Sequence, residues 1–491
     1  MKNMKKIIFT LLLLLTFGLQ INAQTFDVSF KQDLLKESFS GNILLYLSKE
    51  NKTPKDVFVG LELIPVYRIV VNNLKANEVA TFNDSAISYP VELSNIERGS
   101  YYIQVVFDRN MGDSKIGASS GNLFSEPIRV NLTKNFDEVF RIEAEKIVAP
   151  ISFKETEFLK ELSVKSELLS NFHNKDIFVN AAVVLPEGYH ENPNLQYPVI
   201  YSIFGFGANY KLHAGKGKNK FTNLGDQPVI VVYLDGNCPE GHSTYANSDI
   251  NGPWGDALVE EFIPALNKKY RTNKANFLFG HSSGGWSSLW LQINYPKVFS
   301  GAWSSAPDQV DFRNYQNKNI YETKNMFYDD KGNLLADVTI AGRFPVVSAK
   351  DFYRTENVIY RGSQLHSFDA VFGGYDENGK RIRLVNLPDG EINQDALPLW
   401  KRYDLSIKLR ENWNALKDDL DNKIRISVGT SDNFYLNHSV ALLESEMKKL
   451  NAEIEFQYYP GDHFTVFTDE YQKEGVLFLE KCYNRWLKEK K

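Results

Sequence analysis

Cysteine is scarce in this sequence of 491 residues, which contains only Cys238 and Cys482. Two cysteines form one bridge at most, so the sequence excludes a small fold that disulfides hold together. A bond between these two would require the fold to bring their Cα atoms within about 7 Å. The sequence leaves that pairing open. The hydrophobic content of 43% is that of an ordinary globular protein with a sizeable apolar core.

A strong excess of either charge is also lacking. The chain has 56 Lys and Arg residues against 61 Asp and Glu residues, for a formal net charge of −5. Nucleic-acid-binding domains usually carry a strongly basic patch, so no nucleic-acid partner is expected. No internal repeat or low-complexity tract is visible, and a chain of this length favours two domains.

A third absence is an apolar run long enough to span a membrane. Residues 7–19 are apolar, but a spanning helix needs about 20 such residues. Lys2, Lys5 and Lys6 precede this run, and the small residue Ala23 follows it. This pattern is typical of a signal peptide. We therefore predict that residues 1–23 direct export to the periplasm or out of the cell, without stable membrane insertion. No cysteine follows the expected cleavage site, so a lipid anchor is not expected there.

The next part of the chain, residues 24–150, is predicted to be rich in β-strands. Strands expected at residues 26–30, 41–47 and 101–107 are separated by polar, turn-rich segments, and no long amphipathic helix interrupts them. This pattern is typical of an immunoglobulin-like β-sandwich domain. Residues 133–158 are charged and less patterned, and we interpret them as a connection. The domain could be a structural module or bind carbohydrate.

Residues 151–491 alternate apolar strands with helices. Strands are expected at residues 176–185, 197–203 and 229–234, before a helix at residues 256–270. This alternation predicts an α/β fold with a mostly parallel sheet covered on both faces. The pattern then becomes irregular, so we interpret residues from about 308 to 423 as a long insert, such as a lid or cap. Its aromatic residues could line an acyl or phenolic pocket or pack in a core: Phe344, Phe352, Tyr353, Tyr360, Phe368, Phe372 and Tyr375.

The most informative motif is Gly280-His281-Ser282-Ser283-Gly284, between a short apolar strand and a helix. In an α/β-hydrolase fold, a Gly-x-Ser-x-Gly turn holds a nucleophilic serine in strained backbone angles, and the glycines leave room for the turn. The turn also points the amide after the serine at the developing oxyanion. We therefore predict Ser282 as the nucleophile and the Ser283 N–H as an oxyanion donor.

A serine nucleophile needs a histidine base, which an acid orients, and in this fold the chain order is Ser, Asp or Glu, His. His463 directly follows the strand expected at residues 453–459, so it is the predicted base. His366 lies in the insert and could contact substrate, whereas His438 is interpreted as a surface or packing residue. The remaining histidines lie inside the turn or precede Ser282 and fit the order badly: His173, His190, His213, His242 and His281.

The predicted acid is Asp432, the only carboxylate in the loop after the strand at residues 424–428. Asp432 could instead only cap the next helix, but it lies one strand before His463, as a triad requires. A second oxyanion donor is expected from the loop after an early strand. That loop contains Gly205-Phe206-Gly207, and the Phe206 N–H is the predicted donor.

Together these residues resemble the putative esterase (esterase D-like) family of α/β hydrolases. The resemblance covers roughly residues 160–491 and rests on four motifs: Tyr-Pro-Val-Ile-Tyr at 197–201, Glu261-Phe262-Ile263-Pro264, Gly-His-Ser-Ser-Gly-Gly at 280–285, and Pro460-Gly461-Asp462-His463. It implies a triad of Ser282, Asp432 and His463, with Phe206 and Ser283 forming the oxyanion hole. The family includes S-formylglutathione hydrolases, enterochelin esterases and feruloyl or acetyl-xylan esterases.

This chain departs from the family at two places. The family often has His-Gly at the oxyanion loop, where this chain has Phe204-Gly205, and the stretch 308–423 exceeds that of the compact members. The signal-peptide pattern and the β-rich front domain look more like the exported members.

The expected function is that of an exported serine esterase, which hydrolyses a carboxylic ester through an acyl-enzyme and requires no metal or cofactor. The substrate would be a small-molecule or polysaccharide ester, for example an acylated carbohydrate. One alternative is a siderophore esterase of the enterochelin type. Another is a catalytically inactive binding protein on a hydrolase fold. The sequence predicts neither the acyl group nor the oligomeric state.

Overall fold

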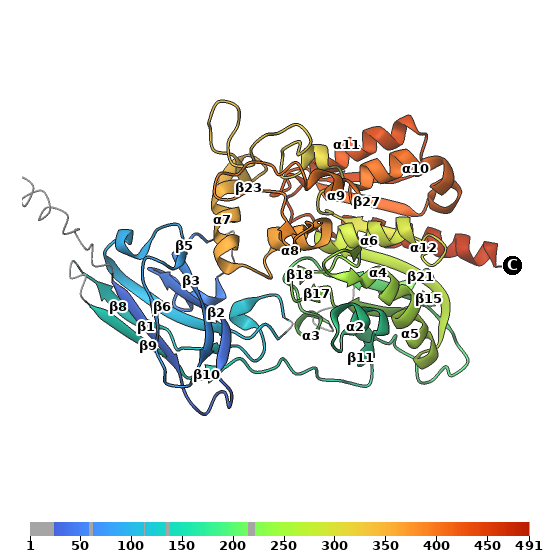
Figure 1. Ribbon diagram of the computed structural model, residues 1–491. Helices are drawn as coiled ribbons and strands as arrows, with labels where there is room; N and C mark the ends of the chain where they lie inside the picture. Colours follow the sequence, from blue (N-terminus) through green and yellow to red (C-terminus); the bar gives the residue numbers. More distant parts are fainter. Residues whose placement is uncertain (1–23, 58–61, 112, 134–137, 215–220, 491) are drawn as a thin grey trace, which may run out of the picture. The chain divides into compact units, whose positions relative to one another are not determined.

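The computed structural model describes residues 24–57, 62–111, 113–133, 138–214 and 221–490. The predicted signal peptide, residues 1–23, lies outside the described residues. The chain divides into two compact units (Figure 1). The first unit comprises residues up to Val57, Ile64–Arg109 and Asn122–Ile147. The second comprises Phe58–Leu63, Asn110–Gly121 and Val148–Lys491, so it includes a loop that lies inside the predicted front domain.

In its described part, the first unit consists of β-strands that form two sheets, with short 3-10 turns at Pro54–Asp56 and Leu93–Asn95. One sheet has the order β4-β1-β9, and the other has the order β10-β7-β6-β2-β3-β5, with β8 also paired to β6. The bounds are β1 Thr25–Phe30, β2 Phe39–Ser48, β3 Val66–Leu74, β4 Ala80–Phe82, β5 Ile87–Tyr89, β6 Gly99–Asp108, β7 Leu123–Phe124, β8 Ile128–Leu132, β9 Val139–Ala144 and β10 Lys146–Ile147.

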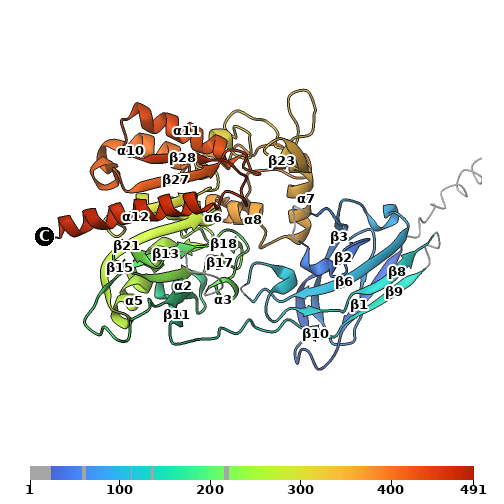
Figure 2. The ribbon, with the colours of Figure 1, turned by 180° about the vertical axis from the view of Figure 1, so that it is seen from behind.

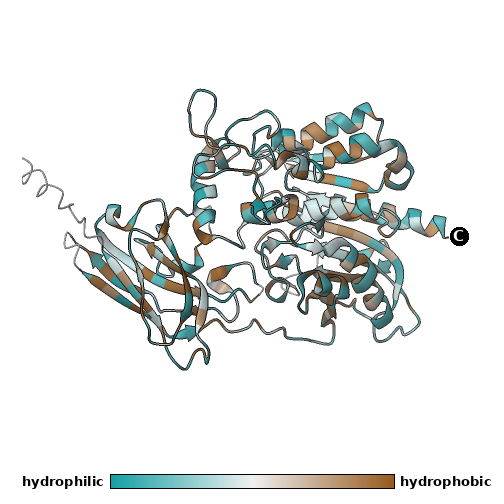
Figure 3. Ribbon diagram, viewed as in Figure 1, coloured by the Kyte–Doolittle hydropathy of each residue, from teal (hydrophilic) through white to brown (hydrophobic). Residues whose placement is uncertain are grey.

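The two sheets of this unit share one hydrophobic core. Side chains of a strand alternate between its faces, so Phe26, Val28 and Phe30 of β1 all point inward and are buried. Leu45 of β2 and Val105 of β6 belong to the same core. Hydrophobic and hydrophilic residues accordingly alternate along several strands of this unit (Figure 3). This arrangement is compatible with the predicted β-sandwich.

The predicted connection at residues 133–158 is partly wrong. It contains β9, which pairs in parallel with β1 along its whole length, and the short strand β10. Only the even positions of β9 that include Ile142 and Ala144 are apolar and buried. Val139 is apolar but exposed, and Arg141 and Glu143 carry charge, so the strand did not stand out in the sequence pattern.

In the second unit, strands of the described chain form an eight-stranded sheet of order β11-β12-β16-β13-β21-β22-β27-β28. β11 and β12 are antiparallel to their neighbours, and β16 to β28 run parallel, as predicted for a mostly parallel sheet. The bounds are β11 Leu159–Lys165, β12 Phe178–Val184, β13 Tyr197–Ile203, β16 Ile230–Leu234, β21 Thr272–His281, β22 Ala302–Ser305, β27 Ile424–Gly429 and β28 Glu455–Tyr459.

Helices cover both faces of this sheet because successive side chains of its central strands point to opposite faces. Val199 and Tyr201 of β13 share a core with α4, η4 and α5, whereas Ile200 shares a core with α12 (Figures 1 and 2). The helices outside the insert are α2 Glu167–His173, α3 Tyr210–His213, α4 Trp254–Asp256, η4 Ala257–Phe262, α5 Ile263–Lys269, α6 Ser283–Asn294, α11 Leu436–Lys449 and α12 Asp469–Glu489. The single helix predicted at residues 256–270 is divided by the π-helical segment η4, beside Pro264, which cannot donate a backbone hydrogen bond.

The insert at residues 308–423 contains more regular structure than predicted. It comprises a short 3-10 turn, two hairpins and four helices in its described residues: η5 Phe312–Asn314, β23 Ala336–Ile340, β24 Phe344–Ser348, α7 Ala349–Ile359, α8 Gln364–Phe372, β25 Gly374–Tyr375, β26 Arg381–Ile382, α9 Leu397–Lys401 and α10 Leu405–Leu420. Most of its aromatic residues, including Phe352 and Phe372, are buried in a core shared with α6 and α11. Only Phe344 and Tyr375 of the seven named above are strongly exposed.

The described part of the second unit also contains three short antiparallel pairs: Asn223–Leu224 with Gln227–Pro228, Asn237–Cys238 with Gly241–His242, and Asn247–Ser248 with Gly252–Pro253. A 3-10 turn lies at Ile116–Ala118. Cys238 and Cys482 are both buried and free. In the described part of the chain, no helix is both long and apolar enough to cross a membrane.

Candidate active site

The predicted nucleophile lies on a sharp turn between β21 and α6. Ser282 has φ +59° and ψ −124°, a strained combination for a residue other than glycine. The backbone is crowded here, because a Cβ on Gly280 would lie 1.9 Å from the Gly284 carbonyl oxygen, and one on Gly284 would lie 2.0 Å from the Ile203 carbonyl oxygen. Only glycine fits at these two positions. The sequence therefore forces Ser282 to the carboxyl end of its strand, at the entrance to the helix.

The predicted base and acid form a buried pair. His463 Nδ1 lies 2.8 Å from Asp432 Oδ2, and the two side chains are 4% and 0% exposed. The other carboxylate oxygen, Asp432 Oδ1, accepts the backbone N–H of Phe434 at 2.9 Å. With Asp432 accepting, the proton of the imidazole resides on Nδ1, which leaves Nε2 able to take a proton. Asp432 thus orients the ring of His463, as the triad prediction requires.

His463 lies beside the turn that carries Ser282. Its ring centroid is 4.5 Å from that of His281, the residue before Ser282. The ring of Phe434 and the ring of Phe464 flank it at 4.9 and 5.2 Å. Among the described residues, no hydrogen bond joins Ser282 to His463. In this structure the Ser282 hydroxyl donates instead to Asp308 Oδ1 at 3.3 Å.

Asp308 is a site residue that the sequence pattern did not reveal. It follows β22, its backbone N–H donates to the Ser282 carbonyl oxygen, and its Oδ2 accepts the Ser283 hydroxyl at 2.5 Å. Burial raises the pKa of Asp308 to about 6, although the hydrogen bonds from Ser283 and Ser282 and the charge of His463 act against this rise. Asp308 is the first residue of the predicted insert, where the apolar strand pattern has ended, and no motif surrounds it in the sequence.

The two predicted oxyanion donors come from opposite sides of Ser282. Ser283 is the first residue of α6, where backbone N–H groups have no acceptor within the helix. Phe206 lies in the loop after β13, next to Gly205. A Cβ on Gly205 would lie 3.2 Å from Ser282 Cβ, so this loop contacts the nucleophile directly. The structure therefore brings both predicted residues close to Ser282.

His242 supports the loop that is predicted to supply the second oxyanion donor, although its place before Ser282 fits the triad order badly. The Thr244 N–H donates to His242 Nδ1 at 2.9 Å, so the ring proton resides on Nε2, which lies 3.2 Å from the Phe204 carbonyl oxygen. Burial lowers the pKa of His242 to about 4, which keeps the ring neutral. Gly236 leaves the space that the ring occupies. A neutral histidine thus holds the residue two positions before Phe206.

The insert in turn supports His242. Ser367 of α8 accepts the His242 N–H at 2.8 Å and donates to the His242 carbonyl oxygen at 2.9 Å. The adjacent His366 contacts Glu240 at 2.8 Å, and Arg381 binds the same carboxylate. His366, for which substrate contact was one possibility, is part of a buried charge cluster with Glu240 and Arg381. His438 is the surface residue that was predicted, close to Asn317.

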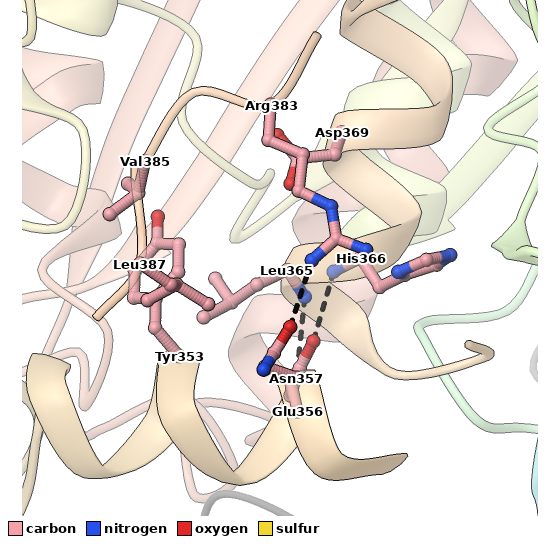
Figure 4. Close-up of a pocket in the computed structure, with 9 residues that line it drawn as sticks. All are labelled: Tyr353, Glu356, Asn357, Leu365, His366, Asp369, Arg383, Val385 and Leu387. Atoms are coloured by element: carbon pink, nitrogen blue, oxygen red, sulfur yellow. Dashed lines mark hydrogen bonds between the residues drawn. The ribbon is translucent and has the colours of Figure 1, made fainter. Parts of the chain in front are cut away.

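A small pocket of about 20 Å³ lies beside α8 (Figure 4). Glu356 on its wall accepts the backbone N–H groups of Leu365 and His366, at the start of α8. Burial raises the pKa of Glu356 to about 8, against the effect of these hydrogen bonds. The pocket has room for about one water molecule. Its residues are separate from the Ser282, Asp432 and His463 site, so we assign it a structural role.

Within the described ranges, no group of three or more His, Cys, Asp or Glu residues could hold a metal ion.

The sheet order and the strained serine turn define an α/β-hydrolase-like protein. Within that class, the family model described as "Putative esterase" matches residues 174–472, more than half of the chain. The chain therefore belongs to this family, and its class of reaction is ester hydrolysis.

Solved structures with a similar chain path have low sequence identity. They include a ferulic acid esterase (15% identity, 66% of this chain and 98% of that chain, TM-score 0.37). They also include an S-formylglutathione hydrolase from Agrobacterium tumefaciens (16%, 67% and 97%, 0.40) and an IroE-like serine hydrolase from Shewanella oneidensis (15%, 66% and 80%, 0.35). None of the curated proteins compared with the chain matches it significantly.

Proposed function

We propose that this protein is an exported serine esterase that hydrolyses a carboxylic ester through an acyl-enzyme. The observation that carries the proposal is the buried pair of His463 and Asp432, 2.8 Å apart, beside a strained serine on a strand-to-helix turn. Such an arrangement activates a hydroxyl that would otherwise be a weak nucleophile. The sequence pattern of residues 1–23 supports export.

In the proposed reaction, His463 Nε2 accepts the Ser282 proton as Oγ attacks the ester carbonyl carbon. The Ser283 and Phe206 N–H groups bind the oxyanion. The intermediate collapses, the bond to the alcohol breaks, and His463 returns the proton to the leaving alkoxide. A water molecule then attacks the acyl-enzyme, again with His463 as base, and releases the acid. Asp432 stabilises the imidazolium in both halves of the reaction.

Exposed apolar side chains next to the site support a substrate with an aromatic or sugar ring. Phe464 directly follows His463 and is 64% exposed. The β23–β24 hairpin contacts the loop that carries Asp432. The Thr339 N–H donates to the Asn433 carbonyl oxygen, and Gly342 packs against Ser431. Phe344 in that hairpin is 56% exposed. An acylated carbohydrate has both an ester and a ring face of C–H groups that can pack on such aromatic side chains.

The test is a screen of the purified protein against acetyl, feruloyl and siderophore-lactone esters, with Ser282→Ala as the blank. Losing the nucleophile should lower turnover by about 10⁶-fold, and Asp432→Asn by about 10⁴-fold. Asp462→Asn is the matched control, because Asp462 precedes His463 but binds Thr465 and the backbone of its own turn. It should retain most of the activity.

Turnover by Ser282→Ala equal to that of the wild type would exclude the proposed nucleophile. Hydrolysis of a catecholate trilactone, without activity on sugar esters, would favour the siderophore alternative. Failure of Ser282 to react with a fluorophosphonate probe, together with no turnover, would indicate a binding protein instead.

A further inference from the structure

Asp308 is a buried carboxylate that the proposed triad does not use. It is 5% exposed, and it touches the nucleophile through Oδ1 and the neighbouring Ser283 hydroxyl through Oδ2. The proposed acid function already belongs to Asp432, which binds His463 Nδ1. Among the described residues, no Lys or Arg forms a salt bridge with Asp308. A buried carboxylate without a cation is costly, so its position beside Ser282 calls for a reason.

The contact with Ser282 places Asp308 within reach of a bound acyl group. In an acyl-enzyme the carbonyl carbon is bonded to Ser282 Oγ, and Asp308 Oδ1 lies 3.3 Å from that oxygen. A substituent on the carbon next to the carbonyl lies three bonds from Oγ, which is only two bonds beyond the carbonyl carbon. Oδ1 is therefore close enough to accept a hydrogen bond from a hydroxyl or ammonium group at that carbon.

Charge favours the same conclusion. A negative carboxylate next to a developing oxyanion opposes the reaction, because two like charges repel at short distance in a buried site. A donor on the substrate would offset the charge of Asp308. It would also occupy Oδ1 and so release the Ser282 hydroxyl, which would then be free to donate to His463. A substrate that lacks such a donor would leave Ser282 bound to Asp308.

We propose that Asp308 selects esters whose acyl group carries a hydrogen-bond donor, a hydroxyl or an ammonium, on the carbon next to the carbonyl. The inference rests on the proposed esterase function and adds a substrate class to it. Asp308 is then a specificity-determining residue, and the hydrogen bond that Ser283 donates to Oδ2 fixes the direction of Oδ1.

Four small esters test this proposal: ethyl lactate, ethyl 2-methoxypropionate, ethyl propionate and alanine ethyl ester. Acid release is followed by titration at constant pH. The wild type should hydrolyse ethyl lactate with a kcat/KM at least about tenfold above that of the methoxy ester, whose oxygen cannot donate. Preference for alanine ethyl ester over ethyl propionate would show that the ammonium is also accepted, and its absence would restrict the class to hydroxy acids.

Asp308→Leu should abolish the preference for ethyl lactate, and Asp308→Asn should keep part of it, because its side-chain oxygen still accepts a hydrogen bond. If Asp308→Leu does not fold, Asp308→Asn still tests the role of the charge. In that variant, kcat/KM for alanine ethyl ester should fall to the value for ethyl propionate. Asp311→Asn is the matched control: Asp311 is buried in the same segment but binds Arg313. It should lower the melting temperature without changing the ratios.

Unchanged ratios in a folded Asp308 variant would overturn the proposal and leave Asp308 as a support for the turn. A wild type that hydrolyses ethyl propionate as fast as ethyl lactate would overturn it as well. Both outcomes leave Ser282-dependent turnover intact. Failure of the esterase proposal itself would differ, because Ser282→Ala would then hydrolyse these esters as fast as the wild type.

Discussion

His242, a histidine without any catalytic motif around it, supports the loop after β13 that contains Phe206. Its ring accepts one backbone N–H and donates to the Phe204 carbonyl oxygen, so it links two loops that are far apart in the sequence. The pairing of His463 with Asp432 beside the Ser282 turn could be predicted from the sequence, because chain order and strand ends constrain where such residues lie. Their catalytic roles stay predictions. His242 and Asp308 could not be predicted, since their roles depend on contacts across the sheet that leave no local pattern.

We predict that His242→Ala lowers kcat about tenfold or more with little change in KM, because a displaced oxyanion donor weakens binding of the transition state alone. Steady-state kinetics on one ester measures both constants. His438→Ala serves as control, since His438 lies at the surface, and it should retain both constants. A rise in KM with an unchanged kcat would instead place His242 in substrate binding.

At the level of the elements, strands were easier to predict than the insert. β13 matches its predicted bounds, because seven consecutive buried residues in a parallel sheet form an unmistakable apolar run. The helix α10 was missed, although Asp404 caps it and Leu405, Leu409 and Trp413 recur at helical spacing. Polar residues between them lower the mean hydropathy of α10. The irregular segments before and after this helix also obscured its helical periodicity in the sequence. Helix α8 was also missed. Its first backbone N–H groups are bound by Glu356 of another helix, and the side chain of its own N-cap residue makes no capping hydrogen bond.

The carboxyl of Glu356 makes the stability of this region depend on pH. Its pKa rises from 4.5 to about 8 on folding, so the folded state keeps a proton that the unfolded state loses above pH 4.5. The free energy of unfolding should therefore fall as pH rises from about 4.5 to 8, by up to about 1.4 kcal/mol per pH unit from this group, and level off above. Other titrating groups act in the same range, so the difference between wild type and Glu356→Gln isolates the contribution.

Urea unfolding of both proteins at several pH values measures this difference. Relative to Glu356→Gln, the wild type should be most stable near pH 5 and should lose stability steadily towards pH 8. A gap that is constant over this range would mean that Glu356 is ionised in the folded state.

At the scale of the whole molecule, the loop Asn110–Gly121 belongs to the second unit, although in sequence it lies between β6 and β7 of the first. Buried Arg361 donates to the Asp113 carbonyl oxygen at 2.7 Å. Ser114 binds Asn237, whose amide donates to the Ala208 carbonyl oxygen in the oxyanion loop. Two domains could be predicted from composition and pattern. The membership of this loop in the second unit could not be predicted, because the strands on both sides of it, β6 and β7, pair with each other within the first unit.

We predict that a chain starting at residue 148 is less stable than the chain starting at residue 24, because buried Arg361 loses an acceptor at a cost of about 1–3 kcal/mol. Its turnover should fall as well, since Asn237 loses its contact with Ser114. Melting temperatures and kcat/KM of the two chains measure both effects. Ser114→Ala in the longer chain isolates the Asn237 contact. Equal stability and turnover in both chains would show that the loop is dispensable.

The shared loop also limits how this protein can exchange parts with others. A gene fusion that replaced everything before residue 148 would substitute a foreign β-hairpin tip for the one that meets Asn237. Such a fusion would therefore change the contacts of Asn237 near the candidate active site, although every residue from 148 onwards stays the same. Fusions that retain function should be those that keep residues 110–121 together with the rest of the second unit.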